Sequence, residues 1–451
     1  MASHQSPPSP DIGLCQEITF DGSEHDLARH TLAWCAVEEG RVPTDILDHL
    51  LKHTRNSAGI PLHANLGWLL SQCQRSDEAI NRLYKDLDEF PESEDLKLLA
   101  AICLFRANEV VTSCRVLEDI LQSSPGNRIA RYYYAEVLMN SGKWTEGLFE
   151  MEKSRGDLTP LQGEFCKDIS RLWMGQDLKG MSIVIVGNNR QSDEVQFVRF
   201  TEQLTRMGAD RIGYACSPEM VEIMRSIREI NRVDSVRFEP YHYFIPVESL
   251  PFRLGLQSGA ISGGPYLKCN SRRIEQKRQK LQKGLPLLGI CWRNHEVDGP
   301  DSGEVTYRRM SASLGTKELR HLLSSLAFEY DIVSLQQQLL PGERELLNQY
   351  GVRVLEQEEF DSFETVGETM SCLDQIITVD SPIAHLAGAL GLRAHTLLHT
   401  IPGWKWDVVD GKSTWYPTLK IHQKVTEGDW APCLESLLQK IVVRKSLEKA
   451  S

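Results

Sequence analysis

Several signals that would fix a class of protein are missing from this chain of 451 residues. No apolar run approaches the ~18 residues that cross a bilayer, and the polar start M-A-S-H-Q-S-P-P-S-P lacks the apolar core of a signal peptide. The net charge of −12 argues against a broad surface for nucleic acid or for an anionic membrane. We therefore expect a cytoplasmic protein with no membrane span and no nucleic-acid partner.

Motifs that carry well-known chemistry are also missing. The 11 cysteines are odd in number and contain no C-x-x-C pair, which favours reduced thiols over a disulfide framework or a zinc site. No G-x-G-x-x-G, G-x-x-x-x-G-K-[ST] or G-x-S-x-G sequence is present. The sequence thus gives poor support to a dinucleotide-dependent oxidoreductase, a P-loop ATPase or a serine hydrolase, and it predicts no metal centre.

The first third of the chain repeats itself. Residues 1–24 are rich in Ser and Pro and predict a mobile tail. From 25 to 160 small residues recur every 34 positions, at Ala33, Gly67, Ala101 and Ala135. Stacked helical hairpins need small residues where helices approach closely, so 25–160 resembles tetratricopeptide (TPR) repeats, whose period is 34. The units at 60–93 and 94–127 fit best, and the one at 27–59 is degenerate. The array either docks a protein or peptide or only braces the next domain.

After a polar linker at 161–180, the pattern changes to strands alternating with helices. Strands are predicted at 181–186, 212–215 and 233–238, with an aromatic, Pro-containing loop at 241–255. This succession predicts a parallel sheet covered by helices, over 181–283.

A charged helix at 271–283 leads into a second series of strands. These are predicted at 286–292, 330–335, 352–355, 375–379 and 394–398. A Trp-rich loop at 403–417 and a final helix follow, which gives a second domain at 284–432 and a helix with a tail at 433–451. The fold class is therefore α + α/β, with helical repeats followed by two Rossmann-like domains.

The stretch from Gln375 to Gly391 is the strongest local signal of a ligand site. An apolar strand runs directly into a helix, with Asp380 and Ser381 as cap residues and Pro382 at the first helical position. Free N–H groups and the positive end of the helix dipole at such a turn can hold a phosphate. An ordinary strand–helix unit remains the alternative.

Six motifs, taken together and in order, resemble a bacterial family that fuses TPR repeats to a glycosyltransferase region related to the heptosyltransferases of lipopolysaccharide synthesis. The motifs are D-E-V-Q-F-V-R-F (193–200), S-L-P-F-R-L-G (249–255), G-I-C-W-R (289–293), V-S-L-Q (333–336), V-D-S-P-I-A-H-L-A-G-A-L-G (379–391) and W-K-W…W-Y-P (404–417). The resemblance covers roughly 60–430.

The resemblance implies the GT-B architecture, in which the C-terminal domain holds a nucleotide-sugar and the N-terminal domain presents the acceptor. No cofactor or metal is implied, because helix N-termini and basic side chains neutralise the leaving diphosphate. The implied donor-binding residues are Asn294, Ser334, Gln336, Glu364, Thr365, Asp380, Ser381, His385, Trp404 and Trp406. Arg293 is added on its charge alone, because a planar guanidinium just after a strand can pair with phosphate, whereas the family usually has a small residue at this position. For His385 a packed core position, and for the two tryptophans a role in anchoring their loop, stay open.

An inverting sugar transfer also needs a carboxylate that takes the acceptor proton. Asp193 matches the acidic residue of the family's G-L-G-D turn, with Glu194 as a second choice. The family's glycines are replaced here by Arg190-Gln191-Ser192, so the standard acceptor turn is altered. The leading hypothesis is a transferase acting on a protein docked by the repeats, such as flagellin or an adhesin. The alternative is a degenerate transferase that serves as a scaffold.

Overall fold

The computed structural model describes residues 66–67, 70–71, 75–155, 162, 168–235, 241–261, 263–294, 313–426 and 429–448. Contacts between Cα atoms divide the chain into two compact units, Met1–Ser123 and Ser124–Ser451. The predicted tail at 1–24 and the degenerate repeat at 27–59 lie outside the described residues. The division at 123 falls inside the segment predicted as repeats.

Three long helices lie in the described part of the first unit. They are α4 (Ser76–Glu89), α5 (Glu94–Arg106) and α6 (Val110–Ser123). The small residues lie where these helices meet: the Ser113 hydroxyl donates to the Ala101 carbonyl at 2.7 Å, and a Cβ atom on Gly67 would lie 2.7 Å from Leu83 Cδ2. Larger side chains at these positions would force the helices apart.

The second unit opens with α7 (Arg128–Asn140) and α8 (Trp144–Ser154), which pack against each other. A Cβ atom on Gly147 of α8 would lie 3.0 Å from the Ala135 carbonyl oxygen of α7. Along the sequence α4, α6 and α8 begin 34 residues apart, and so do α5 and α7. The sequence period is thus the period of the helices, while membership of the TPR class stays a prediction.

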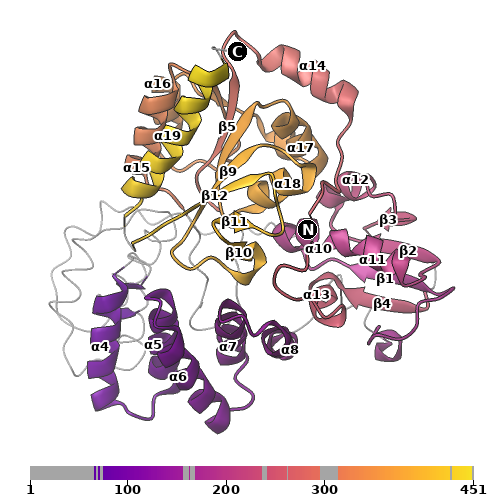
Figure 1. Cartoon of the computed structure of the whole chain (residues 1–451), viewed down its shortest axis with the longest axis vertical. Helices are drawn as coiled ribbons and strands as arrows, with labels where there is room; N and C mark the ends of the chain where they lie inside the picture. Colours follow the sequence, from indigo (N-terminus) through magenta and orange to yellow (C-terminus); the bar gives the residue numbers. More distant parts are fainter. Residues whose placement is uncertain are drawn as a thin grey trace, which may run out of the picture. The chain divides into compact units, whose positions relative to one another are not determined.

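A four-stranded parallel sheet follows in the order β3-β2-β1-β4 (Figure 1). Its strands are β1 (Ser182–Val186), β2 (Arg211–Ala215), β3 (Arg232–Asp234) and β4 (Tyr243–Pro246). The helices in this part of the chain are α10 (Gln191–Phe197), α11 (Thr201–Arg206), α12 (Val221–Met224) and α13 (Leu250–Arg253). Val195, Phe197, Val198 and Leu204 are buried in the same core cluster as Ile183 and Ile185 of β1.

The prediction of a loop throughout 241–255 is wrong, because β4 lies within it. Two of the aromatic residues in this segment, Tyr243 and Phe244, are strand residues, and Phe244 and Ile245 are buried. Pro246 ends the strand, which is compatible with its place at the edge of the sheet, where one side of the backbone needs no partner.

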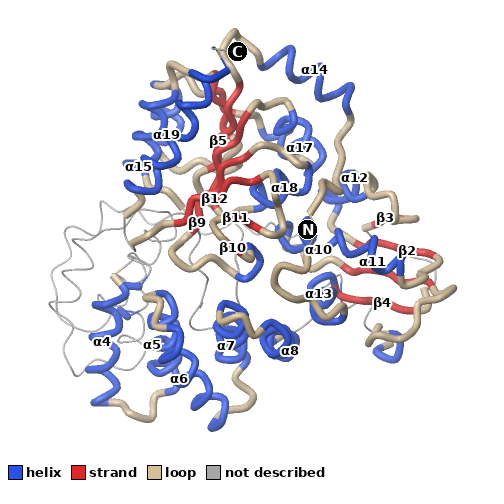
Figure 2. The backbone as a smooth tube through the Cα atoms, viewed as in Figure 1, coloured by secondary structure: helices blue, strands red, loops and turns tan. Residues whose placement is uncertain are grey.

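A six-stranded parallel sheet forms the rest of the fold, in the order β12-β9-β8-β5-β6-β7 (Figure 2). Its strands are β5 (Leu287–Cys291), β6 (Asp331–Ser334), β7 (Arg353–Val354), β8 (Gln375–Val379), β9 (Ala394–Leu398) and β12 (Leu419–Gln423). Numbered within the sheet, this order reads 3-2-1-4-5-6, that of a doubly wound nucleotide-binding sheet.

Helices cover both faces of this sheet. Alternate residues of β5 separate the layers: Leu288 and Ile290 pack with α15, α16 and α19, while Leu287 and Cys291 lie in the cluster that contains α17 and α18. The helices are α14 (Ser271–Leu281), α15 (Thr316–Leu326), α16 (Glu343–Gln349), α17 (Phe363–Ser371), α18 (Pro382–Leu390) and α19 (Ala431–Glu448). No helix in the described part of the chain is long and apolar enough to span a membrane.

The strand β12 and the structure inside the Trp-rich loop were not predicted from the sequence. That loop contains the 3₁₀ helix Trp404–Trp406 and the short hairpin of β10 (Val408–Val409) and β11 (Lys412–Ser413). The strand β12 was missed because its residues, L-K-I-H-Q, mix apolar and polar types instead of forming an apolar run. It pairs with β9 and completes the sheet.

Candidate functional site

The six-stranded sheet reverses its strand order between β5 and β8, which pair side by side. In a doubly wound sheet a crevice opens at this point, outside the carboxyl ends of the strands. Arg293 and Asn294 follow β5, and Asp380 and Ser381 follow β8. The structure therefore brings these four predicted residues to one edge of the sheet.

Arg293 is 6% exposed and forms an ion pair with Glu343, the first residue of α16. The Trp292 indole donates to the same carboxylate at 3.0 Å, and the Leu340 backbone N–H donates to it at 2.7 Å. Burial lowers the pKa of Arg293, and the Glu343 carboxylate opposes that effect. The Nη1 nitrogen of Arg293 is buried and has no hydrogen-bond partner within the described residues, so it can still donate to an anion.

Gln336 holds the end of β5 in place. Its Oε1 accepts from the backbone N–H groups of Trp292 (3.2 Å) and Arg293 (2.9 Å), and its Nε2 donates to the Arg293 carbonyl at 3.2 Å. Ser334 Oγ accepts from the Gln336 N–H at 3.3 Å. Both residues are buried, so the structure shows them positioning Arg293. Direct contact with a nucleotide stays a prediction for both.

Ser381 occupies the N-cap position of α18, but its side chain does not cap the helix. Its hydroxyl lies 3.0 Å from the Thr378 hydroxyl instead, while its carbonyl accepts from the N–H groups of Ala384 and His385. Ser381 is thus the N-cap residue, as predicted, although it caps the helix through its backbone and not through its side chain. The first N–H groups of α18 and the positive end of its dipole face the edge where β8 ends, because α18 follows β8 directly.

His385 and the two tryptophans are core residues in this structure. The His385 ring stacks on Trp406 with centroids 4.7 Å apart, and its Nδ1 lies 3.1 Å from the Tyr416 hydroxyl. Trp404 stacks on Phe197 at 5.8 Å. With exposed fractions of 2% for His385, 6% for Trp404 and 1% for Trp406, these side chains anchor their loop and present little surface to a ligand.

Glu364 and Thr365 lie at the start of α17 and face α14. Arg273 of α14 pairs with Glu364 at 3.5 Å, and Lys277 donates to the Thr365 carbonyl at 2.9 Å. Burial, more than any neighbouring charge, raises the pKa of Glu364. These contacts fasten α14 to α17, and the predicted ribose or base contact of the two residues remains untested.

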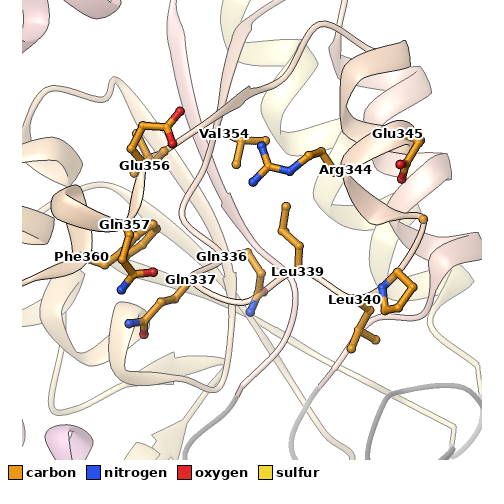
Figure 3. A pocket seen from close by; sticks show the side chains of 13 residues that line it. Gln336, Gln337, Leu339, Leu340, Arg344, Glu345, Val354, Glu356, Gln357 and Phe360 are labelled. Atoms are coloured by element: carbon orange, nitrogen blue, oxygen red, sulfur yellow. The ribbon is translucent and has the colours of Figure 1, made fainter. Parts of the chain in front are cut away.

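A pocket of about 540 Å³ lies at the carboxyl ends of β6 and β7. Gln336 and Gln337, which follow β6, line one part of the pocket. Phe360 also lines it and comes from the connection between β7 and α17 (Figure 3). Gln336 is also the residue that binds the backbone at Arg293, so the pocket adjoins the crevice between β5 and β8. The pocket itself was not predicted, since apart from Gln336 of V-S-L-Q its lining residues belong to no recognised motif.

The four-stranded sheet has its own reversal of strand order, between β1 and β4. Asp193, the predicted catalytic base, lies on α10 just after β1 and is 3% exposed. One of its oxygens pairs with the Lys405 ammonium, and the other accepts from Asn188 Nδ2 at 2.9 Å. The structure thus ties Asp193 to the loop between β9 and β10.

Glu194, the second-choice base, is completely buried beside Asp193. Its Oε1 accepts from the Asn189 N–H at 3.0 Å, and its Oε2 has no hydrogen-bond partner within the described residues. Burial is the largest cause that raises the pKa of Glu194 to about 8, and the charge of Glu248 adds to the effect. Burial therefore favours the protonated form of this carboxyl group, which makes Glu194 a poorer candidate for the base than Asp193.

Two histidines lie four residues apart: His395 is the second residue of β9, and His399 follows the strand directly. His395 Nδ1 lies 2.8 Å from His422 Nε2 on the neighbouring strand β12. Among the described residues no group of three or more His, Cys, Asp or Glu side chains comes together as a metal site would require. His395 and His422 instead form a buried hydrogen-bonded contact between β9 and β12.

Neither a scan against protein-family models nor a search of curated proteins found a match to this chain. Among solved structures, a glycosyl transferase family 9 protein from Veillonella parvula has 11% identity and a TM-score of 0.40, over 61% of this chain and 92% of that chain. The ADP-heptose heptosyltransferase II of E. coli has 12% identity and a TM-score of 0.38, over 58% and 99%.

A mutant of the Thermobaculum terrenum O-GlcNAc transferase has 12% identity and a TM-score of 0.27, over 83% of this chain and 84% of that chain. All three TM-scores lie below 0.5, so none of these likenesses assigns a fold or an activity to this chain.

Proposed function

We propose that the chain is a glycosyltransferase of the GT-B type that moves a sugar from a nucleotide-sugar donor to an acceptor. The observation that carries the proposal is the 3-2-1-4-5-6 strand order, whose reversal point brings together Arg293 and the start of α18. A nucleotide diphosphate needs an anion site at such a point. A cation with a free donor and the positive end of a helix supply one.

The donor would lie along the carboxyl edge of the six-stranded sheet. Its diphosphate would accept from Arg293 Nη1 and from N–H groups at the start of α18. Its base would enter the adjoining pocket at the ends of β6 and β7. These two anion-stabilising groups would also stabilise the diphosphate as it leaves, so the chemistry needs no metal.

Transfer would proceed with inversion. The acceptor oxygen forms a bond to the anomeric carbon while the bond from that carbon to the diphosphate breaks, and Asp193 takes the acceptor proton. Asp193 would have to exchange its Lys405 partner for the acceptor hydroxyl, since both of its oxygens are now engaged. Movement of the loop that carries Lys405 is therefore part of the proposed cycle.

The proposed acceptor is a protein held by the helical repeats, with flagellin or an adhesin as examples of the class. The support is the period of 34 residues in both sequence and helices, since stacked hairpins of this kind offer a surface for peptides. The acceptor would then present its hydroxyl at the carboxyl edge of the four-stranded sheet.

A second candidate function is a nucleotide-binding scaffold without transferase activity. It is favoured by the state of Asp193, which is 3% exposed and bound by both Lys405 and Asn188. A base held in this way has no free surface for an acceptor. The altered turn at Arg190-Gln191-Ser192 points in the same direction.

Thermal unfolding of the full chain with UDP, GDP, ADP, CMP and dTDP tests donor binding. A nucleotide present at ~100 times its Kd should raise the free energy of unfolding by about 2.7 kcal/mol. If no nucleotide changes the unfolding temperature, the donor site is wrong and so is the proposal.

Transfer is tested with sugar-nucleotides of the base that binds. Asp193→Asn should abolish release of the diphosphate in the presence of acceptor and leave nucleotide binding intact, whereas Asp210→Asn, at an exposed position just before β2, should keep both. Binding without any transfer in the parent chain would select the scaffold instead.

A further inference from the structure

Three charged residues line the pocket at the ends of β6 and β7: Arg344 and Glu345 come from α16, and Glu356 lies on the opposite side. Figure 3 shows Arg344 extending from α16 across the pocket toward Val354, while Glu345 lies on the outer side of the same helix. Arg344 is exposed and has no ion pair or hydrogen bond within the described residues. It is therefore a free planar donor directed into the pocket.

Glu356 provides the opposite charge. It lies at the N-cap of the 3₁₀ helix Gln357–Phe360, and its side chain accepts from the Glu359 backbone N–H in a capping box. A carboxylate has two oxygens and about four lone pairs, so one capping bond leaves it free to accept more. The cap also fixes the carboxylate in position at the rim of the pocket (Figure 3).

Apolar side chains form walls between the two charges. Leu339, Val354 and Phe360 line the pocket together with the amides of Gln337 and Gln357. A flat, aromatic ligand with polar edges matches this combination, because its faces can lie on the apolar groups. A nucleobase is a ligand of this kind.

The charged groups decide which base fits, because they cannot change roles. Arg344 can only donate hydrogen bonds and Glu356 can only accept them, whereas the amides of Gln337 and Gln357 can turn to do either. Charge-assisted bonds are also about twice as strong as neutral ones. The base must therefore present acceptors to Arg344 and donors to Glu356.

We propose that this pocket selects guanine, so that the donor of the proposed glycosyltransferase is a guanosine diphosphate sugar; this inference rests on the proposed function. Guanine has two neighbouring acceptors, O6 and N7, which a guanidinium binds as a pair. Its next edge carries two donors, N1–H and N2–H, which a carboxylate can accept as a pair. Arg344 and Glu356 supply these two partners.

The other bases fit less well. Adenine alternates acceptor, donor and acceptor along N7, N6 and N1, and uracil alternates in the same way along O4, N3 and O2. Neither has an edge with two acceptors or one with two donors. Cytosine offers N3 and O2 to an arginine but only its N4 amino group to a carboxylate, which makes it the nearest competitor.

Isothermal titration of the full chain with GDP, ADP, UDP and CDP tests the inference. We expect GDP to bind at least ~10-fold more tightly than the others, because each paired contact discriminates by about 10- to 100-fold. Arg344→Gln should weaken GDP by about 10- to 100-fold and move the preference toward ADP, since glutamine pairs with adenine N6 and N7. Glu356→Gln should weaken GDP while keeping an oxygen for the cap.

Matched controls lie close by. Arg320→Gln on α15 and Glu358→Gln on the same 3₁₀ helix change exposed charges that do not line the pocket, and GDP affinity should stay within about twofold. Circular dichroism checks that each variant is folded.

Each outcome decides something. Tighter binding of ADP, UDP or CDP than of GDP overturns the guanine assignment and leaves the proposed donor site standing. A GDP preference that survives both Arg344→Gln and Glu356→Gln overturns the assignment of this pocket to the base. If none of the four diphosphates binds, the guanine assignment fails, and the proposed function fails with it when CMP and dTDP also leave the unfolding temperature unchanged.

Discussion

At the scale of single residues, Gly187 lies directly under the carboxyl group of Glu194. A Cβ atom at Gly187 would lie 2.6 Å from the carboxyl carbon and from both oxygens of Glu194, which is fully buried and has no space to withdraw. Gly187→Ala should therefore lower the free energy of unfolding by about 1–3 kcal/mol. Gly264→Ala is the control, because a Cβ atom there meets nothing within 4 Å. Equal urea midpoints for the two variants would contradict the packing described for the β1–α10 turn.

Glu194 should also give the stability a dependence on pH. Its pKa is about 8 in the folded chain and near 4.5 when unfolded, so between these values the folded chain holds a proton that the unfolded chain releases. The stability is then fully present below pH ~4.5 and is lost as the pH rises through ~8.

Urea unfolding of the parent chain and of Glu194→Gln should be compared from pH 6.5 to 8. This range avoids the titration of His422. Burial lowers the pKa of His422 to about 4, so this residue changes the free energy of unfolding only as the pH falls below 6.5. The parent should lose about 1–2 kcal/mol more than the variant over this range. Parallel curves would show that Glu194 does not titrate there.

The chemistry of the site residues could be read from the sequence only in part. The residues following β5 and β8 do meet, because parallel strands place their carboxyl ends at one edge. The partners of Arg293 and Asp193 could not be read, since Glu343 opens α16 and Lys405 lies in the W-K-W motif, and neither position indicates a contact with a residue so distant in the chain. Long-range pairs of this kind depend on tertiary packing, which periodicity does not encode.

At the scale of elements, one carboxylate makes three hydrogen bonds that fasten the segment 403–416. Asp407 accepts from the Ser258 hydroxyl at 2.6 Å, from the Gly259 N–H at 2.8 Å and from the Thr414 hydroxyl at 2.5 Å. Asp407→Ala should lower the free energy of unfolding by about 1–3 kcal/mol and speed proteolysis of this segment.

Asp410→Ala is a matched control for that experiment. Both aspartates have a left-handed backbone, with φ of 38° at Asp407 and 50° at Asp410, so alanine meets a similar backbone cost at either site. If the two variants lose the same stability, the three hydrogen bonds of Asp407 contribute nothing beyond the backbone.

Elements with continuous apolar runs were predicted well, and β8 and β9 have the predicted bounds, Gln375–Val379 and Ala394–Leu398. Buried parallel strands have such runs because both of their faces are covered. The strands that were missed, β4 and β12, form the edges of their sheets, where burial is less uniform and the pattern is mixed.

At the scale of the whole second unit, hydrogen bonds and an ion pair join residues 193–199, which follow β1, to the later residues Tyr266, Lys405 and Trp415. Gln196 donates to the Lys405 carbonyl at 2.6 Å, Arg199 to the Trp415 carbonyl at 3.0 Å, and the Tyr266 hydroxyl to the Val195 carbonyl at 2.8 Å. The Asp193–Lys405 ion pair completes this set. In this arrangement Asp193, the predicted base, has no free oxygen for an acceptor hydroxyl.

A double-mutant cycle on Asp193 and Lys405 measures the strength of that ion pair. Lys405→Met leaves a buried carboxylate without its cation and should cost about 3 kcal/mol, whereas Asp193→Asn combined with Lys405→Met should recover most of the loss. Urea unfolding of the parent, the two single variants and the double variant gives the coupling energy. Additive effects would mean that the pair does not hold the loop to the first sheet.

The central claim is that a nucleotide binds at the reversal point of the six-stranded sheet, and hydrogen–deuterium exchange locates it most directly. Exchange should be followed by mass spectrometry with and without the nucleoside diphosphate that stabilises the chain. We expect slower exchange in peptides from Ser381–His385 and from 337–344, with β1 unchanged. Slower exchange confined to the four-stranded sheet or to the helices before it, with no change in those two peptides, would contradict the claim.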